Sequence, residues 1–87
     1  PLAPAARHGL ALARYSEGRY ADAAKLLDDL IASKPSADLV RQARYARGLS
    51  LRRQKKWQEA AADLEAFLAA DATPKERSDA RFELALC

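Results

Sequence analysis

The side chains that could carry out catalysis are few and lie far apart. The chain has one histidine, His8, and one cysteine, Cys87, at opposite ends of its 87 residues. A metal site or an activated nucleophile needs at least two such groups at a defined spacing, and the sequence also lacks a glycine-rich phosphate loop. Carboxylate pairs such as Asp28 and Asp29 fall near the end of an expected helix, where water solvates them. We therefore expect no enzymatic activity, no metal and no cofactor.

The middle of the chain concentrates positive charge that could bind an anion. Lys and Arg number 15 against 12 Asp and Glu, which gives a net charge of +3. The stretch between Leu39 and Gln58 has no acid and carries seven cations: Arg41, Arg44, Arg47, Arg52, Arg53, Lys55 and Lys56. Such a stretch could bind an acidic peptide, another carboxylate-bearing partner or a phosphate backbone. The alternative is that the cations pair with acids of neighbouring helices, namely Asp28, Asp29, Asp63 and Glu65.

The composition indicates which elements must position these groups. Alanine and leucine account for 21 and 13 residues, whereas the β-branched residues are Ile31, Val40 and Thr73. A β-sheet needs many such residues, so we expect an all-α chain. No apolar run approaches the roughly 18 residues that cross a membrane. We expect a soluble chain, in the cytoplasm or in the periplasm or envelope of a bacterium. Because the sequence begins at Pro1 and lacks methionine, we also expect a piece of a longer protein.

A shift of the sequence by 37 residues reveals an internal repeat. The first half of the unit aligns at four positions: Ala6/Ala43/Ala80, Arg7/Arg44/Arg81, His8/Tyr45/Phe82 and Leu12/Leu49/Leu86. The second half aligns at four more: Tyr20/Trp57, Ala23/Ala60, Leu27/Leu64 and Leu30/Phe67. The repeats predict one domain over residues 1–87, with repeat 1 at about 4–37, repeat 2 at about 41–74 and part of repeat 3 at about 75–87.

Each repeat is expected to contain two helices. Apolar spacing and breakers predict helices over about 4–15, 20–33, 37–53, 57–70 and 74–86, with turns at about 16–18 and 54–56. The 20–33 helix has one buried face, formed by Ala23, Leu26, Leu27, Leu30 and Ile31. Ser36 is a predicted N-cap, and Thr73-Pro74-Lys75-Glu76 predicts a capping box with a first-turn proline. Asp71-Ala72 is expected to break the fourth helix.

Two antiparallel helices per unit, at a period in the mid-thirties, resemble the tetratricopeptide repeat family. The residues that carry the resemblance are Leu10, Ala11, Gly18, Tyr20, Ala23, Leu27 and Pro35, then Gly48, Leu51, Trp57, Ala60 and Leu64. It implies a right-handed α-solenoid of antiparallel helix pairs. It also implies close helix approach at the small residues Ala11, Gly48, Ala85, Ala23 and Ala60. The aromatic side chains of Tyr20 and Trp57 would fill the corner beneath them.

Two features depart from the family pattern. The period is longer than the family's usual value of about 34, and long-loop units of this kind resemble bacterial cell-envelope repeat proteins. Arg7, Arg44 and Arg81 stand where a large apolar residue is usual, and Arg47 stands at a position that is usually leucine. We expect the first three to lay their stems on apolar surface and pair with acids of the adjacent second helix.

The resemblance also implies a binding site, because first helices of successive units line a concave groove in this family. The matching positions are His8, Leu12, Tyr15, Ser16, Tyr45, Leu49, Arg52, Arg53, Asp79, Phe82 and Leu86. Positions 45, 49 and 52 share one helix face. The repeat would stack an aromatic ladder (8, 45, 82) beside a leucine ladder (12, 49, 86), suited to apolar side chains of a peptide or helix. Alternatively, these residues pack one repeat on the next.

The resemblance implies a scaffold for protein–protein interaction rather than an enzyme. One alternative is binding of nucleic acid or another polyanion by the basic helix, with Tyr45 and Trp57 stacking on bases. A second is a structural spacer in a bacterial envelope assembly. Self-association is a further expectation, through Phe82, Leu84 and Leu86 of the incomplete third repeat. The carboxylate clamp of chaperone-binding members is not expected, because it uses asparagine and the chain has none.

Overall fold

The computed structural model describes residues 3–69 and 73–86, and these residues form helices and no strand. The helices are α1 (Pro4–Ser16), α2 (Tyr20–Ala32), α3 (Ala37–Arg53), α4 (Trp57–Ala69) and α5 (Pro74–Ala85). The all-α prediction is confirmed, and the predicted helix ends lie within one residue of the observed ones. The expected break at Asp71-Ala72 lies outside the described residues.

Short-range chemistry explains where the helices begin. The Ser36 hydroxyl accepts a hydrogen bond from the backbone N–H of Leu39 at 3.2 Å, which caps α3 as predicted. Thr73 and Glu76 form the predicted capping box, in which each side chain accepts from the backbone N–H of the other. Two of the donors that a helix start leaves without an intrahelical partner are thereby satisfied.

The turns between paired helices share one backbone conformation. Gly18 has a φ of +81° and Lys55, one repeat later, has a φ of +65°. Many helices end with one residue in the left-handed conformation, and glycine adopts this conformation without steric cost. The second repeat therefore makes the same turn as the first, but with a lysine that carries the strain.

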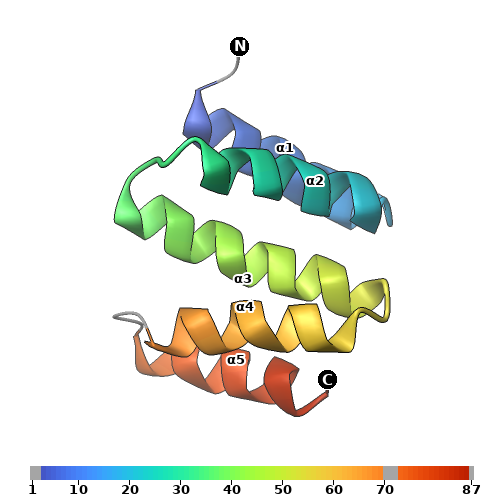
Figure 1. The fold of residues 1–87 in the computed structure, drawn as a ribbon, viewed down its shortest axis with the longest axis vertical. Coiled ribbons are helices and arrows are strands. Elements are labelled where there is room, and N and C mark those ends of the chain that lie inside the picture. The colour runs from blue at the N-terminus through green and yellow to red at the C-terminus, as the bar shows by residue number, and fades with distance from the viewer. Residues whose placement is uncertain (1–2, 70–72, 87) are drawn as a thin grey trace.

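The helices stack in chain order as antiparallel pairs, a solenoid that spans 35 × 26 × 19 Å (Figure 1). Each helix packs on the next, and α1 also contacts α3. Buried apolar side chains line the contacts: Ala11, Ala23, Ala24, Leu27, Leu30, Ala43, Ala46, Ala60, Leu64, Phe67 and Ala80. A Cβ placed on Gly48 would lie 3.1 Å from Cγ of Leu64. Small residues therefore set the close approach of α3 and α4, as the resemblance implies.

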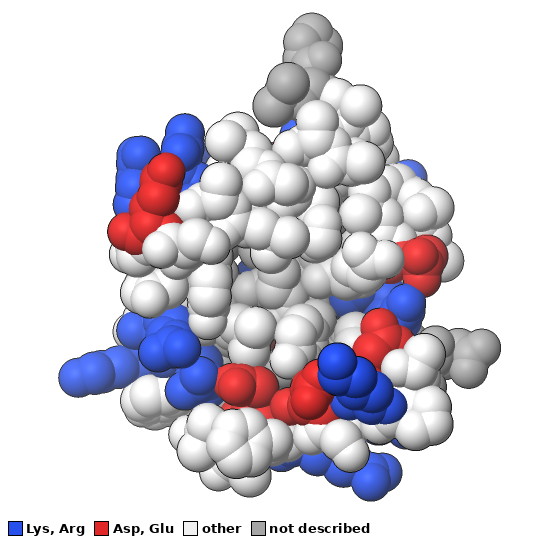
Figure 2. All heavy atoms as spheres, turned by 180° about the vertical axis from the view of Figure 1, so that it is seen from behind, with Lys and Arg blue, Asp and Glu red and all other residues white. Residues whose placement is uncertain are grey.

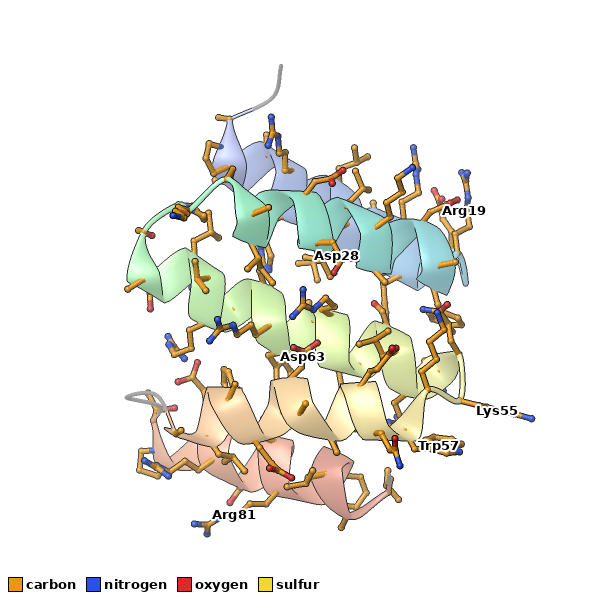
Figure 3. All side chains as sticks on the ribbon, viewed as in Figure 1. Arg19, Asp28, Lys55, Trp57, Asp63 and Arg81 are labelled. Carbon is orange, nitrogen blue, oxygen red and sulfur yellow. The ribbon has the colours of Figure 1, made fainter. Side chains whose placement is uncertain are left out.

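Two of the residues expected to pack are exposed. Trp57 was expected to be buried beneath Ala60, but 43% of its surface is exposed, whereas its counterpart Tyr20 is half-buried against Tyr15 with ring centroids 5.1 Å apart. The prediction is wrong for Trp57, which starts α4 at the edge of the stack (Figure 3): the residue one repeat after Tyr15 is Arg52, which pairs with Glu83 instead of supplying a second aromatic ring. Ala85 is also exposed, since no described helix covers that side of α5.

Candidate binding groove

The first helices of the repeats enclose a hollow of about 390 Å³. Its lining comes from α1 (His8, Leu12, Tyr15), α3 (Gln42, Tyr45, Ala46, Leu49), α4 (Phe67) and α5 (Glu76, Asp79). Figure 2 shows the hollow near the centre of a largely uncharged surface, with acidic side chains on the side of α5. The hollow is large enough for one or two apolar side chains of a ligand.

An aromatic pair lies among the lining side chains. The rings of Tyr45 and Phe67 lie 4.8 Å apart at 40°, and Phe67 is only 3% exposed. The guanidinium of Arg41 lies over the Phe67 ring, 5.5 Å from its centroid, and this cation–π contact further restrains the ring. Leu12 is 43% exposed and stands at the rim. The hollow is therefore apolar and held in shape by contacts between α3 and α4.

Six of the eleven groove positions named from the sequence line this hollow: His8, Leu12, Tyr15, Tyr45, Leu49 and Asp79. Ser16 is exposed at the end of α1, and Arg53 donates a hydrogen bond to the Tyr15 hydroxyl at 3.2 Å. Phe82 and Leu86 lie outside the lining and are 65% and 48% exposed. The α5 side of the hollow is lined instead by the first half of that helix, through Glu76 and Asp79.

Four lining residues were not proposed from the sequence: Gln42, Ala46, Phe67 and Glu76. Gln42, Ala46 and Leu49 are spaced i, i+4, i+7, so the helix face that predicted Tyr45 and Leu49 could have revealed them. Phe67 gives no such signal. It aligns with Leu30 of the core and reaches the hollow only because α4 packs behind α3.

Three cations of α3 are neutralised by neighbouring helices. Arg47 donates two hydrogen bonds of 2.7 Å to the Asp63 carboxylate of α4 and one of 2.8 Å to Asp28 of α2 (Figure 3). Arg41 pairs with Glu76 at 2.8 Å as well as with Asp38 in its own helix, and Arg52 pairs with Glu83 at 2.9 Å. The pairing expected with Asp28 and Asp63 is confirmed.

The other predicted pairings do not occur among residues 3–69 and 73–86. Within these ranges Asp29 and Glu65 form no ion pair, and neither do Arg7, Arg44 and Arg81. The prediction that this arginine column pairs with acids of the second helices is therefore wrong. Asp28 of α2 and Asp63 of α4 face Arg47, which lies about one helical turn beyond Arg44 on α3.

Three of the side chains that line the hollow have shifted pKa values. That of Glu76 is lowered, first by the hydrogen bond from the backbone N–H of Thr73 and then by the hydrogen bond from Arg41. Burial lowers the pKa of His8 below its ordinary value of 6.5, so this imidazole is neutral at pH 7. Burial also raises the pKa of Tyr45; the negative charges of Glu83 and Asp79 raise it further, and the positive charge of Arg52 acts in the opposite direction. In the part of the chain that the structure describes, no cluster of His, Cys, Asp or Glu could hold a metal ion.

Antiparallel helix pairs stacked in chain order, with an apolar hollow on one face, define an α-solenoid. The profile of the tetratricopeptide repeat family matches residues 1–38 and 41–87, so the chain belongs to that family. No similar curated protein and no similar solved structure is found. Repeats of this family generally mediate protein–protein interactions, and proteins built from them are typically scaffolds without enzymatic activity. Among the described helices, none has the length and apolar character needed to cross a membrane.

Proposed function

We propose that the chain is a protein–protein interaction module that binds a peptide segment or helix of a partner in the hollow between α1, α3 and α5. The observation that carries the proposal is the apolar hollow of about 390 Å³ with the Tyr45–Phe67 pair in its lining. Concave apolar pockets with a few polar groups are where proteins bind ligands. The partner would contact chiefly His8, Leu12, Tyr15, Tyr45 and Leu49.

Ion pairs across the repeats support a preformed site. Arg41 and Arg52 of α3 connect to Glu76 and Glu83 of α5, at 2.8 and 2.9 Å, with both arginine side chains 15% exposed. These contacts hold two walls of the hollow at a set separation. A partner would then bind with little ordering of the groove, which keeps the entropic cost of association low.

The polyanion alternative has less support. Three of the seven cations between Leu39 and Gln58 already pair with carboxylates, and a fourth, Arg53, bonds to a tyrosine. Trp57 is exposed and directly follows Lys55 and Lys56, so it is the side chain on which a nucleic-acid base would stack. A structural spacer would need neither surface.

Two substitutions of equal exposure separate these functions. Leu12 and Trp57 are both 43% exposed, so Leu12→Asn and Trp57→Asn each place an uncharged polar group at a surface position without emptying the core. The chain is used to select ligands from a library of random displayed peptides. We expect the selected peptides to lose at least about fivefold in affinity for Leu12→Asn and to keep it for Trp57→Asn, because an amide without a hydrogen bond in an apolar contact costs about 1–3 kcal/mol.

Two further outcomes would contradict the proposal. Failure to select any peptide, or equal binding to all three proteins, removes the groove as a peptide site. Tight binding of a fluorescent oligonucleotide that weakens steeply with salt and is lost in Trp57→Asn would favour the polyanion function instead. Circular dichroism of each variant establishes that the fold is retained.

A further inference from the structure

The charge of the hollow is opposite in sign to the charge of the chain. The protein as a whole is +3, yet the charged side chains that line the hollow are the carboxylates of Glu76 and Asp79. Neither lysine nor arginine is among the lining residues. His8 adds no positive charge at pH 7, because burial lowers its pKa. The lining is therefore apolar with carboxylates on the side of α5, and Figure 2 shows Lys and Arg side chains next to the acidic ones at that edge.

The two carboxylates differ in what they already bind. Glu76 accepts from the backbone N–H of Thr73 at 2.8 Å and pairs with Arg41 at 2.8 Å. Asp79 is exposed and forms no ion pair with any residue in 3–69 or 73–86. It lies three residues after Glu76, on the same face of α5. Asp79 is thus the lining carboxylate best placed to bind a cation brought by a ligand.

The basic helix does not reverse this field. Arg41 and Arg52 are neutralised by Glu76 and Glu83 of α5. Burial is the main cause of the raised pKa of Tyr45. The charge of Glu83 also raises it, but its ion-pair partner Arg52 acts in the opposite direction, whereas the charge of Asp79 raises it with no ion-pair partner among the described residues. An acidic partner in the hollow would place its carboxylate beside these groups. Like charges in a partly enclosed site disfavour that partner.

We propose that the segment bound by this hollow carries a lysine or arginine next to an apolar or aromatic side chain. The apolar side chain packs on the Tyr45–Phe67 pair, and the cation donates a hydrogen bond to the Asp79 carboxylate. This inference rests on the proposed function and specifies the chemistry of the partner. It replaces the acidic partner expected from the sequence with a basic, apolar one, because charge complementarity is set by the lining of the hollow and not by the net charge.

Peptide selection tests the inference directly when Asp79→Asn is compared with Asp29→Asn. Both aspartates are exposed on helices, but Asp29 lies on α2 and outside the lining. Asparagine keeps the shape of the side chain and removes its charge. We expect peptides selected on the unaltered chain and on Asp29→Asn to be enriched in Lys or Arg within four residues of an aromatic residue or leucine. Peptides selected on Asp79→Asn should keep the apolar residue and lose the cation.

A double-mutant cycle then measures the contact. In the best selected peptide, replacement of the cation by glutamine should weaken binding to the unaltered chain about three- to tenfold, and to Asp79→Asn less than twofold. Peptides that depend on Leu12 but are enriched in Asp or Glu, or show no charge preference, would overturn this inference and leave the proposed function standing. Selected peptides indifferent to Leu12→Asn would overturn both.

Discussion

Removal of the Asp63 carboxylate should destabilise the fold far more than removal of Asp28, although both bind Arg47. Asp63 accepts two hydrogen bonds of 2.7 Å and its side chain is 9% exposed, whereas Asp28 accepts one of 2.8 Å and is 61% exposed. Arg47 keeps its charge when either carboxylate is removed, because a guanidinium stays protonated in proteins; in the unaltered chain the hydrogen bond to Asp63 raises the pKa of Arg47 further. The cost of each substitution therefore follows the burial of the carboxylate that is lost.

The magnitude follows from the geometry. Breaking a buried ion pair costs about 3–5 kcal/mol, because the remaining charge is left without its partner. Arg47 retains Asp28 and its side chain is 23% exposed, so water and one carboxylate recover part of that cost. We expect Asp63→Ala to lower the free energy of unfolding by about 2–3 kcal/mol. Asp28→Ala removes a surface pair and should cost less than about 1 kcal/mol.

Urea denaturation followed by helical circular dichroism measures both variants. For a domain of this size, about 2–3 kcal/mol corresponds to a fall in melting temperature of roughly 8–24 °C. Addition of Arg47→Leu to Asp63→Ala removes the orphaned charge and should recover at least about 1 kcal/mol. Equal costs for Asp63→Ala and Asp28→Ala would refute the reasoning, as would a double variant less stable than Asp63→Ala alone.

Two further predictions concern the backbone. Gly48→Ala should destabilise the chain, because the new Cβ would lie 3.1 Å from the fully buried Leu64. Gly9→Ala should stabilise it, because a Cβ there meets nothing within 4 Å and alanine favours the helix. We expect the free energies of unfolding of the two variants to differ by about 1–3 kcal/mol in urea denaturation, and equal stabilities would contradict the close approach of α3 and α4. Lys55→Gly should stabilise the chain by about 0.5–1 kcal/mol, because glycine adopts the φ of +65° without strain. Lys55→Ala removes the same charge but keeps the strain, so a gain for alanine equal to that for glycine would assign the effect to charge instead.

The candidate site was only partly predictable from the sequence. The 37-residue repeat and the helix periodicity placed Tyr45 and Leu49 on one face of α3, and the structure puts both in the hollow. Phe82 occupies the equivalent repeat position but lies outside the lining. A prediction from the repeat holds only where each unit has the same neighbours, whereas α5 has no described helix packed on its far side.

Local chemistry determined the elements themselves. The abundance of alanine and leucine, the Ser36 and Thr73 caps and the residues of the turns act within a few positions along the chain, so the sequence alone predicted an all-α chain and its helix ends. The same short-range pattern, repeated at a constant period, was sufficient to indicate the repeat family.

Charge and burial were decided by the tertiary structure. The sequence showed an acid-free stretch around Arg41, Arg47 and Arg52 but not which helix faces each cation. Packing brings α2, α4 and α5 against α3, and their carboxylates neutralise these three arginines. Coulomb interactions act through space within a few ångströms and take no account of separation along the chain. The sign of the binding surface therefore depends on which helices pack together, and composition could not reveal it.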